Sequence, residues 1–156
     1  MKKEIKKVFG HNYYLLGIRK EDGQKVWLEE GHFDCGWYYG LGYVEIFNKN
    51  YTDIEEHTHF DCLFFKGNKN CYDLFKEYFN ETTLNDKEIW KLLENMKALY
   101  TIRNYSDLLH LGGAHITQND NKEIIKNDAE YKRINDVVIP TLLNEVYKIV
   151  GGAENE

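Results

Sequence analysis

Hydrophobic and polar residues follow different patterns on the two sides of Gly67. Before Gly67, runs rich in apolar and aromatic residues are separated by polar, turn-forming clusters; the runs are 12–19, 24–28, 32–47 and 54–65. Side chains alternate between the two faces of a strand, and short runs of this kind predict β-strands. Asp22-Gly23 lies between the first two runs and favours a tight hairpin, because both residues tolerate positive φ.

After Gly67 the apolar residues recur every three or four positions, which is the period of an α-helix. Residues 71–79 form a short pattern of this kind. Asn85 and Glu88 have the spacing of a capping box, in which each side chain accepts a hydrogen bond from the backbone N–H of the other. The helix that they open carries apolar residues at helical spacing up to Tyr100.

Glycine and proline divide the rest of the helical half. Asn104 or Ser106 is expected to cap a short helix that ends at Gly112-Gly113, because glycine favours helix ends. The last helical region is expected over about 127–150. It should kink or break at Pro140, because proline removes one backbone hydrogen bond.

Strands first and helices later are typical of an α+β fold. We expect one domain over residues 1–156, with a β-rich half at 1–67 and a helical half at 68–156. A four-stranded antiparallel sheet, over about 12–65, would pack on one face against three or four helices, over about 70–150.

The tetrapeptide His-Phe-Asp-Cys occurs twice, at residues 32–35 and 59–62. In a strand, the histidine and aspartate of each copy would share one face, and the phenylalanine and cysteine would share the other. The second set is expected to be buried: Phe33, Cys35, Phe60 and Cys62. If the two strands are neighbours, the first set would form one polar patch with His57: His32, Asp34, His57, His59 and Asp61.

Such a patch has the chemistry of a divalent metal site. Imidazole and carboxylate groups bind Zn²⁺, Mn²⁺ or Fe²⁺, and the candidate ligands are His57, His59, Asp61, His32 and Asp34. A site with an open coordination position would activate water for hydrolysis. His110 and His115 could complete the site or act as acid and base, and Arg103 could hold an anionic substrate.

Two other interpretations of the repeated tetrapeptide stay open. His-x-x-Cys pairs, His32 with Cys35 and His59 with Cys62, would bind a structural zinc ion if tight turns replaced the strands. Alternatively, the histidines and aspartates form hydrogen-bonded pairs on a half-exposed sheet face and bind no metal.

Residues 36–43 combine glycines with large aromatic side chains, which are Trp37, Tyr38, Tyr39 and Tyr43. On a strand, alternate positions of this segment would belong to the core, and the others would form an exposed aromatic strip. An exposed strip of this kind is typical of a protein-binding surface.

The charge balance limits the partners. The chain carries 26 acidic and 20 basic side chains, a formal net charge of −6, and 15% of its residues are aromatic. This acidic excess disfavours direct nucleic-acid binding, which needs Lys and Arg, and it suits a basic protein partner. The basic residues 1–7 and the acidic pairs 29–30 and 55–56 are expected to be solvated.

Three cysteines, an odd number, do not suggest a disulfide framework and indicate a reducing compartment. The first ten residues lack the apolar core of a signal peptide, and no apolar run approaches the length of a membrane span. We therefore expect a cytoplasmic protein that does not bind membranes.

These features favour a small acidic protein-binding module without a cofactor. It would be a regulator or inhibitor, of the kind found in mobile elements or phages, and would occlude a basic partner that handles nucleic acid. The alternative is a small metal-dependent hydrolase with one Zn, Mn or Fe ion at the His-x-His-x-Asp motif of residues 57–61. The sequence specifies neither the partner nor the oligomeric state.

Overall fold

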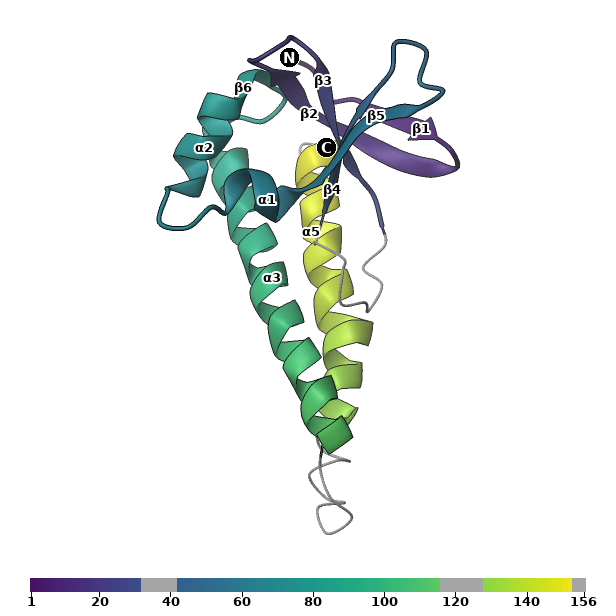
Figure 1. Ribbon diagram of the computed structural model, residues 1–156, viewed down its shortest axis with the longest axis vertical. Coiled ribbons are helices and arrows are strands. Elements are labelled where there is room, and N and C mark those ends of the chain that lie inside the picture. Colours follow the sequence, from purple (N-terminus) through teal and green to yellow (C-terminus); the bar gives the residue numbers. More distant parts are fainter. Residues whose placement is uncertain (32–41, 116–127, 153–156) are drawn as a thin grey trace.

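The computed structural model describes residues 1–31, 42–115 and 128–152, without the side chains of 107–115 (Figure 1). An antiparallel sheet and several helices make up these residues, so the predicted α+β class is confirmed. The sheet has six strands instead of the predicted four. They are β1 (Ile5–Val8), β2 (His11–Arg19), β3 (Lys25–Glu29), β4 (Tyr43–Phe47), β5 (Ile54–His59) and β6 (Phe79–Thr82). Strands β1 to β5 are neighbours in chain order, and β6 pairs with β2.

The helical segments are α1 (Phe60–Phe64), α2 (Cys71–Tyr78), α3 (Asp86–His115), the π-helical η2 (Ile134–Val138) and α5 (Ile139–Gly151). Residues 128–133, just before η2, are also helical. Figure 1 shows α3 and α5 side by side as a long helical pair that extends away from the sheet. The short helices α1 and α2 lie beside the sheet end of α3.

The two faces of the sheet have different environments. One face packs with the helices in the main core, where side chains such as Leu16, Val26 and Phe60 are fully buried. The opposite face carries a smaller cluster: Val8, Tyr13, Leu15, Trp27 and Phe47. Alternation along the strands places Glu45 and His57 on this second face as well.

The predicted hairpin is confirmed, because β2 and β3 pair in an antiparallel manner and Gly23 in the turn has a φ of 75°. The two additional strands both pair with β2, and β1 forms from N-terminal residues that were expected to be solvated. β6 pairs with residues 17–19 of β2. A Cβ atom at residue 17 would lie 2.2 Å from the carbonyl oxygen of Glu81, so this approach requires a glycine.

The run of residues 54–65, predicted as one strand, changes to a helix after His59. The backbone N–H of Phe60 donates a 2.8 Å hydrogen bond to the carbonyl of Gly42, and α1 begins there. Phe60 and Phe64 are both fully buried, and a spacing of four residues places them on one side of a helix. Phe60 is buried as expected, but the prediction for Cys62 is wrong. Cys62 is exposed because residues two apart on a helix do not share a face.

The capping box at the start of α3 is confirmed. The N–H of Asn85 donates to Glu88 Oε1 at 3.1 Å, and the N–H of Glu88 donates to Asn85 Oδ1 at 2.9 Å. The predicted helix break near Asn104 or Ser106 is wrong, because α3 continues through Gly112-Gly113 to His115. Ser106 is buried and accepts a 2.8 Å hydrogen bond from Asn135, so contact between α3 and η2 outweighs its capping tendency.

Pro140 lies in the first turn of α5, directly after η2. The sequence predicted a kink or a break at this residue. The structure has a wider π-helical turn where the ring of proline would clash with a regular helix. The helix ends at Gly151, and Gly152 directly after it has a φ of 85°, a left-handed conformation that glycine adopts readily.

Candidate functional site

A row of polar side chains crosses four strands on the sheet face that bears the smaller cluster. We call Tyr13, Glu29, Glu45 and His57 the polar row. Tyr13 on β2 lies opposite Glu29 on β3, and Glu45 on β4 lies opposite His57 on β5. Only 2% of Glu45 is exposed, and its Oε1 lies 2.8 Å from His57 Nδ1. The row therefore places a buried carboxyl group between a second carboxyl group and an imidazole.

Burial and charge together favour the protonated form of Glu29. Removal from water, followed by the nearby negative charge of Glu45, raises the pKa of Glu29 to about 7. Burial and the same two carboxylates also raise the pKa of Tyr13. Glu45 Oε2 is buried and has no hydrogen-bond partner among the described residues. A proton on Glu29 would provide a donor for it.

Glu29 is expected to make the protein less stable at pH 8 than at pH 5. Its pKa is about 7 in the folded protein against an ordinary value of 4.5, so its stabilising effect is complete below pH 4.5 and disappears as the pH rises through 7. We expect the free energy of unfolding to fall by about 1–2 kcal/mol between pH 5 and pH 8. This fall is smaller than the full pKa shift of Glu29 implies, because Glu29 is only half-buried and water screens its charge. Urea unfolding at both pH values measures the change.

Glu29→Gln should remove this pH-dependent loss, because glutamine is neutral throughout. Glu94→Gln, at an exposed position on α3, is the matched control and should keep it. An equal pH dependence in the wild type and in Glu29→Gln would contradict the proton on Glu29.

Tyr43 packs against both histidines of β5. Its ring centroid lies 4.6 Å from that of His57 and 5.1 Å from that of His59. Only 8% of Tyr43 is exposed, so Tyr43 takes one of the alternate positions of this segment that belong to the core. The other members of the predicted strip, Trp37, Tyr38 and Tyr39, lie outside the described residues.

The second tetrapeptide forms a compact group of different ligand types. One atom each from His59, Asp61 and Cys62 lie within 4.8 Å of one another. Of the predicted ligands, His59 and Asp61 belong to this group, whereas His57 lies beside it, with 6.0 Å between the two imidazole centroids. His32 and Asp34 lie outside the described residues.

The additional residues of the hydrolase hypothesis gain no support from the described geometry. Arg103 on α3 is only 6% exposed, so it is not presented to an anionic substrate in solution. His110 and His115 belong to the last turns of α3, where the side chains lie outside the described part of the chain.

A second polar feature lies along β5, on the side of α1 and α2. We call it the acidic groove: a cavity of about 500 Å³ lined by residues 55–58 of β5, by Arg19 and Glu21, and by apolar parts of Val44, Ile46, Leu63 and Tyr78. Glu55 and Glu21 are exposed at its edge. The groove thus combines an apolar lining with carboxylates.

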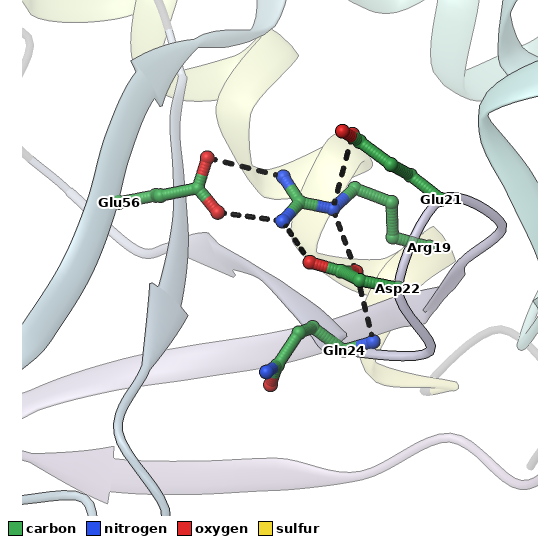
Figure 2. A network of polar contacts seen from close by, with 5 residues as sticks. All are labelled: Arg19, Glu21, Asp22, Gln24 and Glu56. Atoms are coloured by element: carbon green, nitrogen blue, oxygen red, sulfur yellow. Dashed lines mark hydrogen bonds and ion pairs between the residues drawn. The ribbon is translucent and has the colours of Figure 1, made fainter.

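One arginine holds the carboxylates of this groove in place, as Figure 2 shows. Arg19 donates two hydrogen bonds to Glu56, from Nη1 at 3.2 Å and from Nη2 at 2.6 Å. On the other side of the guanidinium group, Nε of Arg19 donates a hydrogen bond to Asp22 Oδ1 at 3.0 Å. Oε2 of Glu21 lies 4.0 Å from the same Nε. Glu56, expected to be solvated, is exposed and is also part of this network. The single positive charge of Arg19 faces several carboxylates, so the edge of the acidic groove keeps a net negative charge.

The chain matches no protein-family model, no curated protein and no solved structure. Its function therefore has to be inferred from its own side chains. None of the helices among the described residues combines the length and the apolar character that crossing a membrane requires.

The residues that sequence reasoning missed are Glu45, Glu29 and Arg19. Glu45 is the one acid inside the apolar run Tyr-Val-Glu-Ile-Phe of β4, and an isolated charge in such a run was the available signal. No comparable signal marked Glu29 or Arg19, because each stands next to other charged residues at a strand end.

Proposed function

We propose that the protein is a binding module whose acidic groove holds a basic segment of a protein partner. The observation that carries this proposal is the combination of several carboxylates with an apolar lining in one cavity of about 500 Å³. Lysine and arginine have apolar stems and charged ends, so their side chains match both parts of such a groove.

The position of β5 supports a specific mode of binding. Within the described ranges, β5 pairs with β4 alone and forms an edge of the sheet. Residues 55–58 of this edge also line the groove. An unpaired edge offers backbone N–H and C=O groups to an extended segment, which would join the sheet as a further strand.

The chemistry of the groove favours a partner that handles nucleic acid. Such proteins bind phosphates through Lys and Arg side chains, and a segment held in the groove could not bind phosphates at the same time. The module would then act in the cytoplasm as a regulator or inhibitor, of the type found in mobile elements or phages. In this proposal it contacts neither nucleic acid nor membrane itself.

Two labelled heptapeptides test the proposal by fluorescence anisotropy. Lys-Val-Lys-Val-Lys-Val-Lys provides the basic extended segment, and the same peptide with glutamate in place of lysine is the control. We expect binding of the basic peptide only, weakened by added salt because the charges are exposed. A double-stranded DNA of about 20 base pairs should compete with the protein for this peptide.

Charge reversal locates the binding surface. Glu21→Lys/Glu55→Lys should weaken binding of the basic peptide at least tenfold, about 1.4 kcal/mol, since two attractive charges become repulsive. The matched control is Glu94→Lys/Asp136→Lys, which changes the net charge equally at exposed positions of the helical pair. Equal losses in both variants, or equal binding of both peptides, would contradict the groove as the binding site.

The metal-dependent hydrolase is the second candidate function, and the group formed by His59, Asp61 and Cys62 is the observation that favours it. Hydrolysis also needs a group that transfers protons and one that binds the substrate. Arg103, proposed to hold the substrate, is only 6% exposed, and the side chains of His110 and His115 lie outside the described residues. The binding proposal therefore rests on more described side chains than the catalytic one.

A further inference from the structure

We propose that His59, Asp61 and Cys62 bind one Zn²⁺ ion at the junction of β5 and α1. This inference does not rest on the acidic groove, because it concerns a different ligand and His59, Asp61 and Cys62 do not line the groove. The junction fixes the relative positions of the three residues. His59 is the last residue of β5, and Asp61 and Cys62 lie in the first turn of α1.

The distances fit a tetrahedral zinc site after small side-chain rotations. The three ligand atoms lie within 4.8 Å of one another. Zinc binds nitrogen, oxygen and sulfur at ~2.0–2.3 Å, which places ligands of a tetrahedral site about 3.3–3.8 Å apart. Each of the three ligand atoms therefore has to move by less than the length of a covalent bond to reach these separations. Cys62 is exposed, so its side chain can rotate without disturbing the core.

Asp61 provides an independent indication of a cation site. Its Oδ1 is buried and has no hydrogen-bond partner among the described residues. A buried carboxylate oxygen without a donor is unfavourable, and a metal ion would satisfy it. Asp61 also lines a cavity of about 560 Å³ between the α1–α2 loop and α3.

His57 is suited to the fourth coordination position. Its Nδ1 lies 2.8 Å from Oε1 of Glu45, so Nε2 is the nitrogen that can face a metal. A carboxylate that orients the second nitrogen of a histidine is common in zinc sites. The imidazole centroids of His57 and His59 are 6.0 Å apart, and both rings contact Tyr43. His57 or a water molecule would complete the tetrahedron.

The ligand types select zinc among the common divalent ions. Thiolate and imidazole are preferred by Zn²⁺, whereas Mg²⁺, Ca²⁺ and Mn²⁺ prefer oxygen ligands. A site of one thiolate, one carboxylate and one or two imidazoles should therefore discriminate strongly against Mg²⁺.

Isothermal titration calorimetry of the 156-residue chain, freed of metal by a chelator and then of the chelator, tests this site. We expect one Zn²⁺ per chain, a rise in melting temperature on addition of Zn²⁺, and no response to Mg²⁺. Co²⁺ should bind at the same site and produce a thiolate-to-cobalt absorption band in the near ultraviolet, which reports Cys62 directly.

Cys62→Ser should abolish the cobalt–thiolate band and weaken Zn²⁺ binding at least about tenfold. Cys71→Ser is the matched control, because Cys71 is a free cysteine outside the ligand group. Asp61→Asn should also weaken binding, and far-ultraviolet circular dichroism checks that each variant is folded. Absence of Zn²⁺ binding, or a cobalt–thiolate band that persists in Cys62→Ser, would overturn the proposal.

Discussion

Replacing Phe60 with alanine is expected to lower the free energy of unfolding by about 3–5 kcal/mol. Phe60 is fully buried where β5 becomes α1, and its ring centroid lies 4.7 Å from that of Phe64 and 5.9 Å from that of Phe65. Truncation removes this ring and leaves a cavity that neighbours on several elements cannot fill. Urea unfolding followed by circular dichroism measures the loss.

The same substitution should disturb the proposed zinc ligands, because Phe60 stands between His59 and Asp61 and anchors the junction. Phe60→Leu keeps most of the buried volume and should cost less than about 1.5 kcal/mol. Phe9→Ala provides a control for removal of a ring from a position that is 56% exposed, and its effect should be much smaller. Equal losses for Phe60→Ala and Phe9→Ala would show that the junction is not anchored by Phe60.

Replacing Arg19 with methionine is expected to destabilise the protein by about 2–3 kcal/mol. Arg19 is 9% exposed and binds carboxylates on two sides, from the β2–β3 turn and from β5. Breaking a fully buried pair costs about 3–5 kcal/mol, and the estimate is lower here because Glu56 and Asp22 are partly exposed and regain water. The unpaired carboxylates would also repel one another.

Arg133→Met is the matched control for this loss. Arg133 forms an ion pair of the same type with Glu130 on an exposed helix surface, and such pairs contribute about 0–1 kcal/mol. We expect 0.5 M salt to reduce the small effect at Arg133 and to leave most of the effect at Arg19. Equal and salt-sensitive losses at both positions would contradict a structural role for the Arg19 network.

Local signals of the sequence predicted local structure well. The Asp22-Gly23 turn and the Asn85–Glu88 capping box depend on contacts between residues close in the chain, and the structure confirms both. The α+β class also followed from the change of period near Gly67. Strands and helices are less strictly separated than predicted, because α1 precedes this residue and β6 follows it.

Contacts between segments that are distant in the sequence account for the elements that the sequence did not predict correctly. β1 and β6 are strands of four residues, and each exists because β2 offers it a partner. The run over residues 54–65 contains aromatic residues that suit a strand, yet burial of Phe60 and Phe64 on one side favours a helix after His59. The continuation of α3 past Ser106 depends on Asn135, which is 29 residues away.

The sequence predicted the kinds of ligand in the candidate metal site better than it predicted which residues form the site. His59 and Asp61 were identified from their spacing, and the structure brings them together. Cys62 was assigned to the core because strand alternation was assumed, and the turn into α1 moves it beside the other two. The sequence did not predict the acidic groove, because Glu21 and Glu56 are 35 residues apart in the chain. Only the fold shows that the β2–β3 turn faces β5.

The most direct test of the acidic groove is a nuclear magnetic resonance titration of the isotope-labelled protein with the basic heptapeptide. Binding in the groove predicts that the largest changes in backbone amide shifts fall on residues 55–58, Leu63 and Tyr78, with small changes along α3 and α5. Changes concentrated on the helical pair, or shifts that remain constant at saturating peptide, would contradict it.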